Sequence, residues 1–70
     1  MTNTALLEKK IDESGYKKSY IAKTIGLKTT NVLTKKVNNE SEFKASEIDA
    51  LCDLLKIDTL EERNLIFFAK

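Results

Sequence analysis

Seventy residues suffice for one small domain, and a chain of this length buries only about 60% of the surface that its unfolded form exposes. Cys52 is the single cysteine and histidine is absent, so an internal disulfide is excluded and a structural metal centre is not expected. The net charge is +1, no apolar run approaches the roughly 18 residues that span a bilayer, and the N-terminal stretch lacks a signal-peptide pattern. We therefore expect one domain over residues 1–70, in the cytoplasm, without a membrane contact, a cofactor or a small-molecule substrate.

Helices and no strands are predicted, because apolar residues recur at spacings of three and four. The expected helices cover residues 5–14, 18–25, 30–37, 46–56 and 59–69. Gly15 and Gly26 follow the first two helices and should end them, since glycine accepts the left-handed conformation found after many helices. Thr29 is the candidate N-cap of the third helix.

Polar residues also predict how the later helices begin. Ser46 and Asp49 fit a capping box at the start of the fourth helix, and Asp58 and Glu61 fit a looser one before the fifth. Phe43 lies in the polar loop between the third and fourth helices, and we expect it to pack back into the core.

Charge is distributed unevenly along the chain. Residues 1–40 hold eight lysines against four acids and carry +4, whereas residues 41–70 hold four basic residues against seven acids and carry −3. Between Ser14 and Asn39 there are six lysines and no acid. A solvated basic surface is the ordinary explanation of such a window. This window coincides with the second and third helices, however, and that coincidence favours nucleic-acid binding.

The junction of the second and third helices carries a specific pattern. Ala22 and Gly26 are four residues apart, and the apolar Leu27 follows. A small side chain allows two helices to pack closely, and glycine permits a sharp turn. With the loop Asn38–Phe43, this pattern resembles the Cro and repressor-type helix-turn-helix family of phages over about residues 6–57. Within that family, the chain is most similar to the small Cro-like or antirepressor (modulator of repression) proteins of temperate phages of Gram-positive hosts.

This resemblance implies an all-α fold, a compact bundle of about five short helices with a helix-turn-helix near residues 18–37. It also implies a regulator of the lysogeny–lysis switch that binds double-stranded operator DNA in the bacterial host cytoplasm. Lys18 stands where the family often has glutamine. The family usually buries the sixth residue after the glycine, here Val32, but the i, i+4 pairing of Leu33 with Val37 predicts that these two are buried instead.

Side chains of the third helix that do not pack are candidates for reading DNA bases. Asparagine can bond adenine at two atoms, threonine offers a hydroxyl and a methyl group, and lysine reaches the acceptors of guanine. The base-reading candidates are Lys28, Thr29, Thr30, Asn31, Thr34 and Lys35. The phosphate-contact candidates are Lys17, Lys18, Ser19, Lys36, Asn38 and Asn39. The alternative roles are helix capping for Thr29 and Asn31, and solvation for Lys23 and Lys36.

A catalytic function is not expected. Cys52 has no histidine to activate it, and its place on the apolar face of the fourth helix predicts a buried thiol. The chain has no glycine-rich phosphate loop, and adjacent carboxylates such as Asp12 and Glu13 point in different directions on a helix.

The C-terminal stretch LIFFAK supports an alternative function. Four consecutive apolar residues, 65–68, extend round a helix, so one packed face cannot cover them all. Either the core surrounds most of this helix, or Leu65, Phe67 and Phe68 form a protein interface. The partner would be a second copy or the phage repressor. In the second case the protein acts as an antirepressor by protein–protein binding, with weak or no DNA binding of its own.

Overall fold

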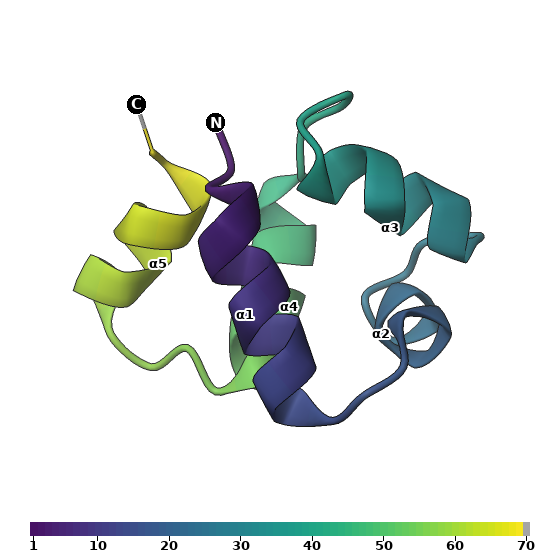
Figure 1. Ribbon diagram of the computed structural model, residues 1–70, viewed down its shortest axis with the longest axis horizontal. Helices are drawn as coiled ribbons and strands as arrows, with labels where there is room; N and C mark the ends of the chain where they lie inside the picture. Colours follow the sequence, from purple (N-terminus) through teal and green to yellow (C-terminus); the bar gives the residue numbers. More distant parts are fainter. Residues whose placement is uncertain (70) are drawn as a thin grey trace.

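The computed structural model describes residues 1–69, which form a compact, all-helical bundle without strands (Figure 1). The helices are α1 (Thr4–Ser14), α2 (Lys18–Thr24), α3 (Thr30–Val37), α4 (Ala45–Leu55) and α5 (Leu60–Phe67). The expected fold class and helix number are confirmed, and the helix limits differ by one or two residues from those expected. In Figure 1, α5 lies on one side of α1, and α2 and α3 lie on the other. Within the described residues, no helix has both the length and the apolar character needed to cross a membrane.

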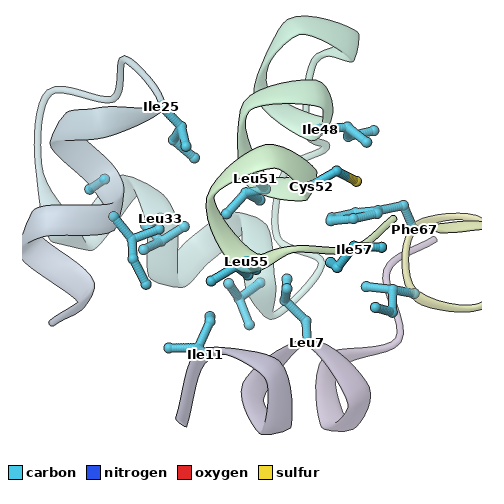
Figure 2. Packing of buried hydrophobic residues seen from close by; sticks show 14 residues of the cluster. Leu7, Ile11, Ile25, Leu33, Ile48, Leu51, Cys52, Leu55, Ile57 and Phe67 are labelled. Carbon is cyan, nitrogen blue, oxygen red and sulfur yellow. The ribbon is translucent and has the colours of Figure 1, made fainter. Parts of the chain in front are cut away.

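Each helix contributes to one apolar core (Figure 2). The most completely buried side chains are Leu7, Ile21, Leu33, Val37, Leu51 and Ile66. Leu33 and Val37 are 0% and 2% exposed, whereas Val32 is half-buried, so the expected register of the third helix is confirmed. Cys52 is buried as expected, and burial raises the pKa of its thiol.

The expected N-cap of the third helix is present, but the expected capping boxes of the fourth and fifth helices are not. Thr29 caps α3, because its hydroxyl oxygen accepts from the backbone N–H of Val32 at 3.3 Å. The expected capping boxes at Ser46–Asp49 and Asp58–Glu61 are wrong. Helix α4 begins at Ala45, one residue before the expected start, and the Glu47 carboxylate accepts from the Lys44 N–H at 2.9 Å. The cap of α5 is Thr59, which accepts from the Glu62 N–H at 3.1 Å.

Gly26 ends α2 by taking a left-handed conformation, with φ of 91°. The N–H of Leu27 donates to the carbonyl oxygen of Ala22 at 2.8 Å, and the N–H of Gly26 donates to that of Lys23 at 3.2 Å. These two bonds form a Schellman motif, and Leu27 packs against the core beside it. The same two bonds follow α3, where Asn39 is left-handed, whereas after α4 the N–H groups of the left-handed Lys56 and of Ile57 both donate to the carbonyl oxygen of Cys52.

Residues 2–4, which we call the N-terminal clamp, join the end of α3 to α5. The N–H of Thr2 donates to Asn39 Oδ1 at 2.9 Å, and Asn39 Nδ2 donates to the Thr2 carbonyl oxygen at 2.9 Å. Two further bonds run from the Asn3 N–H to the Ile66 carbonyl oxygen (2.6 Å) and from the Thr4 hydroxyl to the Val37 carbonyl oxygen (2.7 Å). The N-terminal clamp therefore holds the C-terminal end of α3 and is itself bonded to α5.

Candidate nucleic-acid interface

Helices α2 and α3 cross each other and form the most closely packed pair in the bundle. Figure 1 views α2 almost along its axis and α3 from the side, so the two do not run alongside one another. The turn between them covers residues 25–29. Ala22 is 2% exposed and Ile21 is fully buried, so the inner face of α2 is committed to the core and its opposite face is left to solvent.

The outward face of α3 carries several of the base-reading candidates. Asn31 and Lys35 are exposed, on the side of the helix opposite Leu33 and Val37. Thr34 is half-buried at the edge of this face. The candidates at the start of the helix, Lys28, Thr29 and Thr30, are exposed as well.

A shallow hollow of about 370 Å³ connects the two helices at the surface. Its polar lining comes from Ser19 and Lys23 of α2 and from Lys28, Thr29 and Thr30 at the start of α3. The exposed side chains of the two helices therefore belong to one continuous surface.

Ion pairing distinguishes the lysines of this surface from most other basic residues. Four ion pairs occur among residues 1–69: Lys10–Glu62, Lys18–Glu8, Lys36–Glu47 and Arg63–Asp49. Lys17, Lys23, Lys28 and Lys35 are exposed, and none has an acidic partner within this range. We call the following set the basic surface: Lys17, Ser19, Lys23, Lys28, Thr29, Thr30, Asn31, Thr34, Lys35 and Asn38.

The structure does not support Lys36 as a phosphate contact. It is 8% exposed, and its Nζ atom lies 2.6 Å from Glu47 Oε1 in a buried pair between α3 and α4. Burial raises the pKa of Glu47, but the bond from Lys36, the bond from the Lys44 N–H and the attraction of both lysines outweigh it. The pKa of Glu47 therefore lies below its ordinary value. Lys36 follows the buried Leu33 by three residues, a spacing that makes the two neighbours on the helix surface, and this spacing is the sequence signal for its burial.

Two other phosphate candidates are occupied within the chain. The side-chain amide of Asn39 forms hydrogen bonds with the backbone N–H and with the carbonyl oxygen of Thr2, so it is not free to hold a phosphate. Lys18 is half-buried and pairs with Glu8 at 3.1 Å, which neutralises part of its charge. Lys23, for which solvation was the alternative role, is exposed and lines the hollow between α2 and α3, so we include it in the basic surface.

An exposed aromatic pair adjoins the basic surface and was not predicted. The rings of Tyr16 and Tyr20 have centroids 5.2 Å apart and are 41% and 52% exposed. Their spacing of four residues, on either side of Lys17 and Ser19, is the sequence signal that could have identified them.

A separate apolar surface lies between α1 and α5. Leu65 and Phe68 are each 56% exposed, but Phe67 is 4% exposed and packs edge-on against Phe43, with ring centroids 5.7 Å apart. Phe67 is therefore a core residue, and its prediction as an interface residue is wrong, whereas Phe43 packs against the core as expected. We define the α1–α5 patch as Met1, Leu6, Leu65 and Phe68.

Comparison of the chain with models of known protein families, with curated proteins and with solved structures finds no match. The proposal of a function for this chain therefore rests on the geometry and charge of its own residues.

Proposed function

We propose that the chain is a phage-type transcription regulator that binds operator DNA. In this proposal α2, the turn and α3 form a helix-turn-helix, and α3 enters the major groove. The observation that carries it is the group of exposed lysines without acidic partners, Lys17, Lys23, Lys28 and Lys35, spread over two crossing helices. Phosphates attract such a surface, and the major groove is wide enough to admit an α-helix.

The residues of the basic surface divide by position. The members that lie on or just before α3, where a helix in the groove meets base edges, are Lys28, Thr29, Thr30, Asn31, Thr34 and Lys35. The remaining members flank that helix and suit the phosphate backbone: Lys17, Ser19, Lys23 and Asn38. The bonds that hold the far end of α3 favour this function, because a surface that is already ordered loses less entropy on binding.

The salt dependence of DNA binding tests this proposal. The probe is a pool of fluorescent random-sequence duplexes, followed by the tightest duplex selected from it, and affinity is measured by anisotropy at several salt concentrations. Lys17→Ala and Lys23→Ala, at exposed lysines of the phosphate-contact group, should each reduce the log–log salt slope by about 0.9, the contribution of one neutralised phosphate. Lys9→Ala, at an exposed lysine of α1 outside the basic surface, is the matched control and should leave the slope unchanged. Binding that is insensitive to salt, or equally weakened by all three substitutions, would contradict direct DNA binding by this surface.

The α1–α5 patch supports a second candidate function, capture of a protein partner. Leu65 lies in the last turn of α5 and Phe68 directly follows the helix, and Leu6 and Leu65 line a groove of about 310 Å³ between α1 and α5. Exposed apolar surface of this kind marks protein interfaces. The partner is a second copy or a phage repressor, and in the second case the chain acts as an antirepressor.

Sedimentation of the chain alone, and with the repressor of the same phage, tests the second candidate. Leu65→Glu and Phe68→Glu should each abolish the complex that forms. Leu60→Glu is the matched control, because Leu60 is 72% exposed and lies on another side of α5. Complexes that survive both patch substitutions, or that Leu60→Glu disrupts equally, would exclude the patch as the interface.

A further inference from the structure

Helix α3 presents a row of polar side chains outward with a methyl-bearing residue beside it. Asn31 and Lys35 are one helical turn apart, and both are exposed. Within residues 1–69, neither side chain has a hydrogen-bond or ion-pair partner. Thr34 is half-buried at the edge of the same row, next to the buried Leu33. These side chains are therefore placed for a ligand that meets α3 from outside.

The Thr34 hydroxyl group is already used inside the helix. Its Oγ1 atom donates to the carbonyl oxygen of Thr30 at 3.1 Å. Threonine forms this bond in a restricted rotamer, so the bond also orients the rest of the side chain. The hydroxyl proton is consequently committed within the helix, whereas the γ-methyl group has no such commitment.

We propose that α3 recognises a thymine beside an adenine, with the Thr34 methyl group against the C5 methyl group of the thymine and the Asn31 amide on the adenine edge. This inference deepens the proposed function and rests on it. Both pairings are favourable in the major groove. Side chains three apart on a helix have Cβ atoms about 5–6 Å apart, and base pairs stack about 3.4 Å apart. Asn31 and Thr34 therefore reach base pairs one or two steps from each other.

The test compares DNA molecules that differ by one methyl group. Duplexes are selected from a random 20-base-pair pool by binding to the chain, and the tightest is resynthesised with deoxyuridine replacing each thymidine in turn. At one position this replacement should weaken wild-type binding about fourfold, the equivalent of one buried methyl or methylene group.

Two threonine variants locate the contact. Thr34→Ser keeps a hydroxyl group for the bond to Thr30 but removes the methyl group. It should bind the thymidine duplex about fourfold more weakly than wild type and should not distinguish deoxyuridine at that position. Thr24→Ser is the matched control, because the hydroxyl of Thr24 makes the same kind of bond to the Tyr20 carbonyl oxygen, at 2.8 Å, in α2. This control should discriminate between the two duplexes as wild type does, and circular dichroism checks that both variants are folded.

The possible results distinguish a failure of the methyl contact from a failure of the proposed DNA binding. Equal wild-type binding to thymidine and deoxyuridine at every position overturns the methyl contact, as does discrimination that persists in Thr34→Ser. Salt-dependent binding in either case leaves the helix-turn-helix proposal standing. A lack of salt-dependent binding to every duplex overturns both.

Discussion

Three residues take the left-handed conformation at the ends of α2, α3 and α4, and only one of them, Gly26, is glycine. Lys56 holds φ of 58° after α4, where a side chain costs about 1–2 kcal/mol that glycine avoids. Part of the stability gained by avoiding this cost is lost, because glycine has more conformational freedom in the unfolded chain. We predict that Lys56→Gly raises the free energy of unfolding by about 0.5–1 kcal/mol, measured by urea denaturation. A lower midpoint for the variant would contradict this account.

The converse substitution, of a left-handed glycine by a residue with a side chain, can be made at Gly26. No atom lies within 4 Å of a Cβ atom built at this position, so only the φ of 91° opposes a side chain. Gly26→Ala should therefore lower the free energy of unfolding by about 1 kcal/mol, and the β-branched Gly26→Val should lower it further. If both variants unfold at the wild-type urea concentration, the turn between α2 and α3 does not need the left-handed conformation.

At the scale of elements, the buried Lys36–Glu47 pair ties α3 to α4. Each side chain is about 10% exposed, so removing one partner leaves the other charge buried and unpaired. Lys36→Met or Glu47→Leu alone should cost about 3–5 kcal/mol, whereas the double variant should recover most of that loss. Urea denaturation of the four proteins gives the coupling energy. Additive losses in the double variant would show that the pair does not act as a unit.

The same pair gives the molecule a defined response to acid. The pKa of Glu47 is lowered in the folded state, so its contribution to stability is complete above its ordinary pKa of 4.5 and is lost as pH falls through the lower folded value. The urea midpoint of wild type should therefore fall more steeply below pH 4.5 than that of the Lys36→Met/Glu47→Leu variant. Parallel pH profiles would assign the acid sensitivity to other carboxyl groups.

At the scale of the whole molecule, helices α2 and α3, which carry most of the basic surface, lie on the other side of α1 from α5, which carries Leu65 (Figure 1). Effects of distant substitutions add when they share no contacts. We predict that Phe68→Glu leaves the salt slope of DNA binding per chain unchanged, and that Lys35→Ala leaves sedimentation unchanged. A slope altered by Phe68→Glu would mean that DNA binding requires the partner.

Local patterns were enough to predict most of the fold, although they misplaced the capping boxes of α4 and α5, and long-range contacts account for the errors at Lys36 and Asn39. The spacing of Leu33 and Val37 and the glycine after α2 act within one or two turns of helix, so the sequence reveals both. The partner of Lys36 lies eleven residues away, and that of Asn39 lies thirty-seven residues away. Neither pairing leaves a periodic signal. For the same reason, sequence spacing alone could not separate the buried Phe67 from the exposed Phe68.

The N-terminal clamp has a consequence for the order in which the chain is made. The ribosome synthesises Thr2 and Asn3 before their partners, which are Asn39, just after α3, and Ile66, in α5. During translation these first residues have no native partner until α3 has formed, and the Asn3 bond cannot close before α5 emerges. In a nascent chain arrested before α5, the bonds from Thr2 and Thr4 to the end of the proposed recognition helix can therefore form, whereas the bond that links them to α5 is missing.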